Sequence, residues 1–441
     1  MADNSHPMLQ QKSTFQSGGG VTPSKSFTLH NFYLGLNLFV FRAAKFVVQI
    51  LSARWLSVSD FGFLSWIYTL VDILNNLLGA GVDIVVSRAY KQQADWVALW
   101  QQAIALRLVL GLIGTVVGLL ILPWPYGIFL GAWHIFYLQG RLFYAYANTL
   151  LYPKGIVLSG VLSEGALLVG SVVGLRFFGL EGLIAAFVLE RLVESLSLGA
   201  IVAQRESELL KDFNLSGFPE RSGKVFKNSS RLWANQALGI LASRVDTVLI
   251  KRILGLESVG FYSLAFRTAE APVFIFAAMG DAALAYFIRH QDEKEKNYKK
   301  SIQVASATGL LGALAIVGCS FFVDKVFGAN YAMVKPLLAS YAWILALRGP
   351  NMVSSSYLIS NGRDTSLLVS SALGVVFSLA GNLAFLPIFG IKAACFLSVA
   401  TEGVIFVSRH ALAKKGWGWP ALFSGALVCL SVLSYLVLSR S

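Results

Sequence analysis

Apolar stretches of about twenty residues recur from residue 30 to the end of the 441-residue chain. A helix needs roughly 20 apolar residues to cross a bilayer core of about 30 Å, whereas the strands of a membrane barrel alternate over ~10 residues. The pattern therefore predicts an all-α, polytopic membrane protein. We expect thirteen spans, at residues 30–52, 61–82, 100–122, 126–148, 155–176, 181–203, 231–252, 259–288, 301–323, 334–360, 365–387, 391–409 and 419–438.

Composition narrows the class of protein further. Charged residues make up only 13% of the chain, against roughly 25% in a soluble domain. The three cysteines lie in apolar stretches and the histidines have no metal-ligand spacing, so we expect buried free thiols, no metal and no cofactor. There is no Walker loop, which excludes a fused ATPase. The lack of a long external loop argues against a membrane enzyme such as a polymerase or ligase, so we expect no catalysis.

Basic residues outside the expected spans are unevenly distributed. With the N-terminus in the cytoplasm, twenty Lys and Arg fall on the cytoplasmic side and eight on the other. This positive-inside bias predicts a cytoplasmic N-terminus in a bacterial inner (plasma) membrane. It also accounts for much of the net charge of +13, so no nucleic-acid partner is needed. The polar segment 1–29 is expected to be a disordered cytoplasmic tail.

The chain contains an internal repeat at an offset of 198 residues. Residues 51–65 (LSARWLSVSDFGFLS) and 249–263 (LIKRILGLESVGFYS) are identical at six of fifteen positions, one of which pairs Gly62 with Gly260. Six spans separate the copies, so both halves enter the membrane in the same orientation. Such parallel repeats bind their substrate between two lobes and work by rocking them. Chance similarity between two apolar hairpins is the alternative.

The repeat predicts a simple division of the chain. We expect an N-terminal six-helix lobe at 30–203, a cytoplasmic linker at 204–230, and a C-terminal six-helix lobe at 231–413. Residues 414–441 would hold one extra helix. The substrate site is expected between the two lobes.

Three stretches resemble a known family. VDTVLIKRILGLESVGFYSLAFR (245–267) resembles the start of the second lobe in Wzx-type oligosaccharide flippases of the polysaccharide transporter family, and SARWLSVSDFGFLSW (52–66) the matching first-lobe segment. FGANYAMVKPLLASYAWILAL (327–347) resembles the family's segment leading into its tenth helix. These proteins belong to the multidrug/oligosaccharidyl-lipid/polysaccharide (MOP) superfamily, with the MATE multidrug transporters and the lipid II flippases. The resemblance implies a MATE-like fold of two six-helix bundles and no ATP hydrolysis.

The resemblance also implies a function. Such a flippase moves undecaprenyl-diphosphate-linked sugar units from the cytoplasmic to the outer leaflet for O-antigen, capsule or exopolysaccharide biosynthesis. Its partners would be the lipid-linked oligosaccharide diphosphate, the bilayer, polysaccharide polymerase and ligase proteins, and a coupling proton or sodium ion. A MATE-like multidrug or cation antiporter is the alternative.

The first expected span carries an unusual polar stripe. At 100° per residue, Asn31, Arg42, Lys45 and Gln49 fall within about 60° of one another. A basic residue at the bilayer centre costs at least ~2.5–3.5 kcal/mol, so it needs a partner or a wet cavity. Two cations without an acid on the same stripe predict an anion site, where arginine can bind a diphosphate bidentately. Pairing with acids of neighbouring helices, such as Asp72, is the alternative.

Other charges within the spans extend the candidate site. Arg244 and Arg267 join the substrate-binding candidates, because the resemblance places the first, seventh and eighth helices around the central cavity. Arg267 and Glu270 are three residues apart and can pair directly. Asp72, Asp246 and Glu270 are candidates for binding a coupling ion or for forming ion pairs.

Two further groups of charges have structural interpretations. Glu190, Arg191 and Glu194 are expected to pair with one another at helical spacing. Arg107, Arg141 and Arg348 can extend to the headgroup region if the span boundaries shift by several residues.

Overall fold

The computed structural model describes residues 23–79, 81–89, 96–150, 152–206, 209, 218–290, 292–413, 416 and 418–439. These residues are almost entirely helical and contain no strand, which confirms the predicted all-α class. Of the expected disordered tail, residues 1–22 lie outside the described residues. Residues 23–29 already belong to the first helix.

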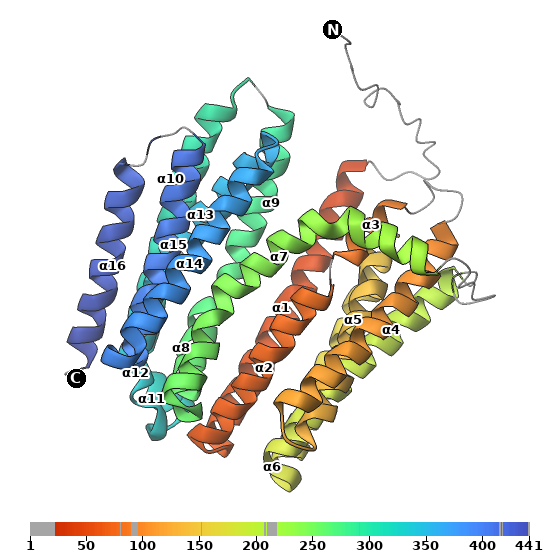
Figure 1. Cartoon of the computed structure of the whole chain (residues 1–441), viewed down its shortest axis with the longest axis horizontal. Helices are drawn as coiled ribbons and strands as arrows, with labels where there is room; N and C mark the ends of the chain where they lie inside the picture. The colour runs from red at the N-terminus through yellow and green to blue at the C-terminus, as the bar shows by residue number, and fades with distance from the viewer. Residues whose placement is uncertain are drawn as a thin grey trace.

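The helices form two bundles, which Figure 1 shows side by side. The first bundle contains α1 (Pro23–Trp55), α2 (Val58–Gly79), α3 (Val82–Ala89), α4 (Trp96–Ile121), α5 (Tyr126–Thr149) and α6 (Pro153–Arg205). The second contains α7 (Phe218–Leu254), α8 (Leu256–Glu270), α9 (Val273–Arg289), α10 (Lys294–Ser320), α11 (Val323–Phe327), η2 (Ala329–Tyr331), α12 (Val334–Tyr341), η3 (Ala342–Ile344), α13 (Leu345–Ser360), α14 (Asp364–Phe389), α15 (Ile391–Leu412) and α16 (Gly418–Leu438).

Eight helices in the described part of the chain are long and apolar enough to cross a membrane, or nine if α8 and α9 form one span with a 45° bend. Helix α6 has 53 residues, about 80 Å at 1.5 Å per residue, and therefore crosses more than once. Its backbone breaks at Gly179 (φ 58°, ψ −130°), between the two spans expected there. The break is possible because glycine has no Cβ to oppose a positive φ.

The remaining expected spans are helical but differ from the simple pattern. Expected span 259–288 is divided where α8 ends before Pro272. Span 334–360 is divided by the turn η3. Helices α5 and α7 fall below the hydropathy of the other spans, because they carry polar side chains toward the protein interior. Residues 218–230 of the expected linker are the first turns of α7.

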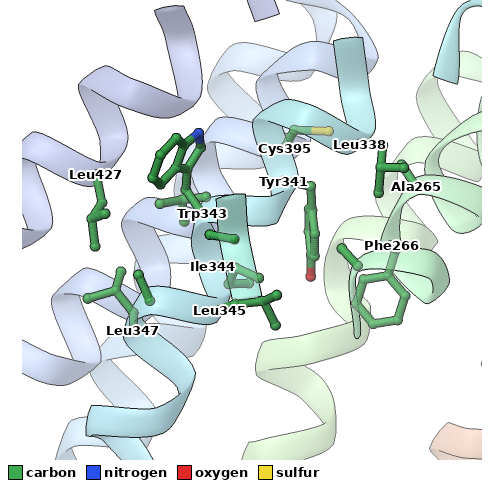
Figure 2. Close-up of a cluster of buried hydrophobic side chains, with 14 of the residues drawn as sticks. Ala265, Phe266, Leu338, Tyr341, Trp343, Ile344, Leu345, Leu347, Cys395 and Leu427 are labelled. Atoms are coloured by element: carbon green, nitrogen blue, oxygen red, sulfur yellow. The ribbon is translucent and has the colours of Figure 1, made fainter. Parts of the chain in front are cut away.

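Each bundle has its own apolar core. In the second bundle, Tyr341 and Ile344 are buried between α8, α13 and α15 (Figure 2). The extra helix α16 is held against this core, since the indole of Trp343 donates a 2.9 Å hydrogen bond to Ser434. Cys395 is buried there as expected, whereas the prediction of burial is wrong for Cys319 and Cys429, which are exposed. An exposed thiol is tolerated because the surrounding helix surface is apolar.

The two bundles approach most closely where α2 crosses α8. A Cβ placed on Gly62 would lie 1.9 Å from the carbonyl oxygen of Leu256, and one on Gly260 would lie 2.6 Å from that of Val58. Gly62 and Gly260 are equivalent positions of the sequence repeat, so the two copies of the repeat face each other at this crossing. The repeat therefore supplies the contact that joins the halves.

We predict that Gly62→Ala destabilises the protein, because the added methyl group collides with backbone and forces the bundles apart. Overpacking of this kind costs roughly 1–3 kcal/mol. The matched control is Gly165→Ala on α6, where the added carbon meets nothing within 4 Å. The midpoint of thermal unfolding in detergent, followed by size-exclusion chromatography, should fall for Gly62→Ala alone. Equal midpoints for the two variants would contradict the close crossing.

Candidate functional site

A cavity of about 340 Å³ lies between the bundles, with walls from α1, α2, α5, α6, α7 and α8. It falls within the usual size range of ligand sites, roughly 300–1,000 Å³. Seven charged side chains line it: Arg42, Lys45, Arg191, Arg244, Arg267, Asp72 and Glu270. Five are cations and two are carboxylates, so the lining has a formal excess of three positive charges.

The structure brings most of the candidate residues together. All five substrate-binding candidates line the cavity, as do the ion-pair candidates Asp72 and Glu270; the five are Arg42, Lys45, Gln49, Arg244 and Arg267. Asp246 instead lines a second, smaller cavity within the C-terminal bundle. The side chain of Asn31, which began the predicted stripe, lies outside the described residues. Arg191 is a lining residue that the sequence interpretation treated only as structural.

The polar stripe of α1 faces the cavity over almost three helical turns. Arg42, Lys45, Gln49 and Ser52 are spaced by three and four residues, and all four line the cavity. The amide of Gln49 also donates a 3.3 Å hydrogen bond to Thr268 on α8. The stripe therefore contacts the opposite bundle as well as the cavity.

The alternative interpretation, pairing with an acid of a neighbouring helix, is confirmed for Lys45, although the partner is Glu190 and not Asp72. The ammonium group of Lys45 binds the buried carboxylate of Glu190 on α6. The expected pairing along α6 is confirmed, because Arg191 contacts Glu190 at 2.7 Å and also binds Glu194. Lys45 and Arg191 therefore line the cavity while each is ion-paired with a carboxylate that does not line it.

Asp72 forms an ion pair across the two bundles. Its carboxylate on α2 accepts a 2.7 Å hydrogen bond from the guanidinium of Arg244 on α7. The guanidinium carbon of Arg244 also lies 4.6 Å from the ring centre of Phe266. Trp233 on α7 donates a 2.7 Å hydrogen bond to the carbonyl of Leu77 on α2. Helix α7 is therefore tied to the first bundle both inside and outside the cavity.

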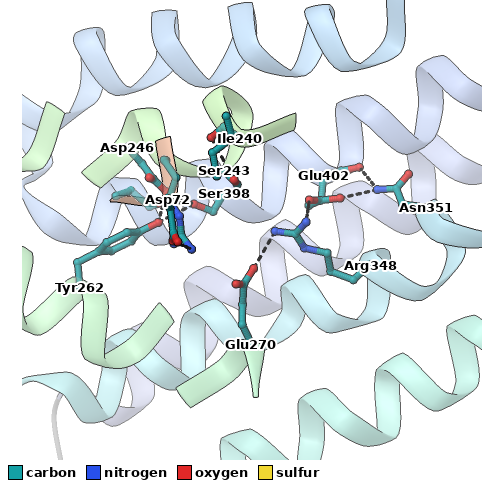
Figure 3. Close-up of polar contacts among 12 residues, drawn as sticks. Asp72, Ile240, Ser243, Asp246, Tyr262, Glu270, Arg348, Asn351, Ser398 and Glu402 are labelled. Carbon is teal, nitrogen blue, oxygen red and sulfur yellow. Dashed lines mark hydrogen bonds and ion pairs between the residues drawn. The ribbon is translucent and has the colours of Figure 1, made fainter. Parts of the chain in front are cut away.

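The expected pair between Arg267 and Glu270 is wrong. Glu270 accepts a 2.9 Å hydrogen bond from Arg348 on α13, while Arg267 lies over the ring of Tyr68 at 4.1 Å (Figure 3 shows Glu270 and Arg348). Glu270 pairs with Arg348 and not with Arg267 because Arg348 lies between two carboxylates. Its second carboxylate partner is Glu402, at 3.0 Å. An arginine held by two carboxylates gains more than one held by a single neighbour on its own helix.

Neither Arg107 nor Arg348 extends to the headgroups. Arg107 is buried and contacts Asp83 at 3.3 Å, and Arg348 is held inside the second bundle as described above. The carboxylates that pair with these two arginines come from other helices. The hydropathy of a single span cannot indicate such partners. The snorkelling interpretation is therefore wrong for these two residues.

Arg42 and Arg267 are different from the other cations in the cavity. Within the described residues, no carboxylate oxygen lies within 4.0 Å of either guanidinium group. The Nε of Arg42 is buried and has no hydrogen-bond partner. The Nε atoms of Arg191 and Arg244 are likewise buried without a partner, whereas Arg267 lies over the ring of Tyr68. A buried donor without a partner is costly, so these guanidinium groups can accept an anion, and Arg42 does so without a carboxylate in competition among the described residues.

Asp246 occupies a separate environment. It is 4% exposed and lines a cavity of about 210 Å³ that also contains Arg348 and Glu402. Its carboxylate accepts a hydrogen bond from the hydroxyl of Tyr262 and one of 2.6 Å from the backbone amide of Thr247 (Figure 3 shows Asp246 and Tyr262). Asp246 is thus stabilised by hydroxyl and amide donors rather than by contact with a cation.

At the end of the molecule marked by α11, the bundles are joined by Arg54. Its Nε donates a 2.8 Å hydrogen bond to the carbonyl of Val326, and its terminal nitrogen donates one of 2.6 Å to that of Lys325. The rings of Phe46 and Phe327 meet edge to face beside it, with centres 6.2 Å apart. The two bundles are therefore in direct contact at this end of the molecule.

Comparison with solved structures defines the class of fold. An inward-facing multidrug resistance MATE family transporter of the MOP superfamily aligns with a TM-score of 0.64 at 17% identity, over 88% of this chain and 95% of the other. The lipid II flippase MurJ, in an inward closed conformation, aligns with a TM-score of 0.66 at 13% identity, over 93% and 98%. The chain has a MATE-like fold, as predicted.

Sequence comparison then gives the family. The family model described as polysaccharide biosynthesis protein matches residues 31–291, more than half of the chain, and the chain belongs to this family. The teichuronic acid biosynthesis protein TuaB of Bacillus subtilis (strain 168) is 26% identical over 245 residues, which are 53% of this chain. The match spans about half, 47%, of that relative's length.

We predict that Asp72 and Arg244 stabilise the protein as a pair. Asp72→Asn and Arg244→Gln should each lower the midpoint of thermal unfolding. The double variant should lose no more than the larger single loss, because either substitution already removes the ion pair. Coupling between contacting residues is typically about 0.5–3 kcal/mol in such a cycle. Losses that simply add would show that the two side chains act independently.

Proposed function

We propose that the protein is a flippase for undecaprenyl-diphosphate-linked sugar units, moving them from the cytoplasmic to the outer leaflet for surface polysaccharide biosynthesis. Membership of the polysaccharide biosynthesis family supports the pathway. The MATE-like fold supports transport by rocking of two bundles. The observation that carries the proposal is the excess of positive charge between the bundles.

The substrate class follows from the charges of the cavity. A diphosphate presents several anionic oxygens, and Arg42 and Arg267 have no carboxylate partner among the residues described. Binding there forms charge-assisted hydrogen bonds in a low dielectric and offsets the cost of burying the arginines. The lipid tail would stay in the bilayer while the diphosphate and sugar cross through the cavity.

The Asp72–Arg244 pair gives the bound anion a way to act on the bundles. The pair joins α2 to α7 at 2.7 Å within the cavity lining. A diphosphate competes with Asp72 for Arg244, because both are anionic ligands of the same guanidinium. Its binding therefore weakens one contact between the bundles and favours their relative movement.

The orientation and location complete the proposal. The positive-inside bias supports a cytoplasmic N-terminus in the bacterial inner membrane. An inside-negative potential favours outward movement of an anionic substrate, by about 2.3 kcal/mol per charge per 100 mV. Polysaccharide polymerase and ligase proteins would take up the exported unit, and no catalytic step is required of the flippase itself.

A MATE-like antiporter of cationic drugs, the alternative from the sequence, is disfavoured by the same cavity. A cationic substrate entering the cavity would meet Arg42 and Arg267, which have no carboxylate oxygen within 4.0 Å among the described residues. Like charges in the same cavity repel each other. If deletion of the protein abolished resistance to toxic organic cations and left surface polysaccharide intact, the antiporter would be the better description.

We predict that Arg42→Ala abolishes surface polysaccharide while the amount of protein in the membrane is unchanged. Lipid-linked units should then accumulate in the inner leaflet, where extraction and mass spectrometry can identify them. Arg42→Lys should retain part of the export, because it keeps the charge but not the bidentate geometry.

The matched control is Arg176→Ala, since Arg176 lies on the exposed surface of α6 away from the cavity. Export in this variant should equal that of the wild type. Normal export by Arg42→Ala would remove this arginine from the mechanism.

A further inference from the structure

The second cavity, of about 210 Å³, lies within the C-terminal bundle and is lined by α7, α12, η3, α13, α14 and α15. Its lining is rich in uncharged groups that form hydrogen bonds. A hydroxyl has one donor and two acceptor positions, so such a lining suits a ligand that both donates and accepts hydrogen bonds. The lining residues with hydroxyl groups are Ser243, Tyr341, Ser355, Ser371, Ser398 and Thr401.

Two buried polar atoms in this lining have no partner among the described residues. They are the hydroxyl oxygen of Thr401 and the Oδ1 of Asn351, in residues that are 4% and 3% exposed. The Nδ2 of Asn351 is already used, because it donates a 2.6 Å hydrogen bond to Glu402. Buried polar atoms that stay unpaired cost free energy, so these two indicate a ligand that supplies their partners. Asn351 Oδ1 needs a donor, and the Thr401 hydroxyl can bond either a donor or an acceptor.

The charges in the described lining of the second cavity balance, unlike those of the first. Its cations are Arg348 and Arg409, and its carboxylates are Asp246 and Glu402. Arg348 binds Glu402 at 3.0 Å, while Asp246 accepts hydrogen bonds from hydroxyl and amide donors. A further cation would therefore find both carboxylates already bonded, and an anion would find no excess of positive charge. The lining favours a neutral ligand.

The two cavities adjoin at an ion pair. Glu270 lines the first cavity and Arg348 lines the second, and their side chains are 2.9 Å apart (Figure 3). On α7, Arg244 lines the first cavity while its neighbour Ser243 lines the second. Arg267, which is proposed to bind the diphosphate, precedes Glu270 by about one turn of α8. A group attached directly to the bound diphosphate can therefore reach the second cavity.

We propose that the second cavity is a subsite for the first sugar of the lipid-linked substrate, the one esterified to the diphosphate. The proposal rests on the proposed function, because it takes a lipid-linked sugar diphosphate as the substrate. A sugar is neutral, and its hydroxyls can donate to Asn351 Oδ1 and exchange hydrogen bonds with Thr401. The volume is below the roughly 300–1,000 Å³ of sites for drug-sized ligands, which limits the subsite to one sugar unit.

The subsite gives the protein a way to distinguish a loaded lipid carrier from an empty one. A site built to bond hydroxyl groups discriminates against ligands that lack them, because its buried polar atoms then stay unpaired. The cationic first cavity cannot make this distinction, since the diphosphate is present with or without the sugar. The two cavities therefore recognise different parts of one substrate.

The test measures binding to the full-length protein in lipid nanodiscs with two probes of equal charge. One probe is undecaprenyl-diphosphate-linked N-acetylglucosamine. The other is undecaprenyl methyl diphosphate, in which a methyl group replaces the sugar. Native mass spectrometry gives a dissociation constant for each probe. The wild type should bind the sugar-bearing probe about tenfold more tightly, since it alone fills the second cavity.

Thr401→Val removes a lining hydroxyl and keeps a side chain of similar shape. The variant should fold, because this hydroxyl has no partner within the part of the chain that the structure describes. Affinity for the sugar-bearing probe should fall by about three- to tenfold, and affinity for the methyl probe should not change. If Thr401→Val does not fold, Ser371→Ala, which removes a lining hydroxyl from α14, decides with the same expectation.

The matched control is Thr308→Val, because Thr308 lies on α10 and is not among the described residues lining either cavity. This variant should bind both probes as the wild type does.

The outcomes separate this inference from the proposed function. Equal affinities of the wild type for the two probes would overturn the sugar subsite and leave the flippase intact. An unchanged preference for the sugar in Thr401→Val would also overturn it, as would an equal loss of affinity for both probes, which a coupling ion in this cavity would produce. Failure of the wild type to bind either probe would contradict the proposed function and the subsite together.

Discussion

Positive charge without a matching carboxylate, enclosed between two apolar bundles, is the constraint on which the rest of the structure depends. Most of the buried cations described here have partners: Arg107 has Asp83, and Arg348 is held between two carboxylates. Arg42 and Arg267 contrast with these within the described part of the chain. Helices that must keep such groups away from lipid can do so only around a hydrated cavity, and two bundles of the same orientation provide one.

The contacts between the bundles are of two kinds, and they suggest different roles. The crossing of α2 and α8 is a close backbone contact at Gly62 and Gly260, where each glycine faces a carbonyl oxygen of the other helix. The Asp72–Arg244 pair and the hydrogen bonds of Arg54 are polar contacts that an anion or water can replace. One tight backbone crossing and several exchangeable polar contacts are the arrangement that the proposed rocking of two bundles requires.

Features set by local geometry could be predicted from the sequence, while features set by distant partners could not. The stripe of Arg42, Lys45 and Gln49 follows from helical periodicity alone, and all three side chains face the cavity. The partner of Glu270 could not be found in this way, because Arg348 is 78 residues away and competes with the neighbouring Arg267. A single sequence contains no signal for such a choice.

The same reasoning explains the errors in the spans. Hydropathy identifies helices that face lipid, such as α4. Helices α5 and α7 direct polar groups toward the protein interior, so their mean hydropathy is lower than that of a helix surrounded by lipid. The break of α8 before Pro272 was hidden within one long apolar stretch. Arg191 was assigned correctly to an ion pair, yet its place in the cavity wall depends on how α6 packs against α1, which periodicity within α6 does not specify.

The most direct test of the central claim is a cryo-electron microscopy structure of the full-length protein in lipid nanodiscs with an undecaprenyl-diphosphate-linked sugar. The account predicts density for the diphosphate between the bundles, in contact with Arg42 and Arg267. Density for the diphosphate at the outer surface of the bundles, with the two arginines still unliganded, would contradict it.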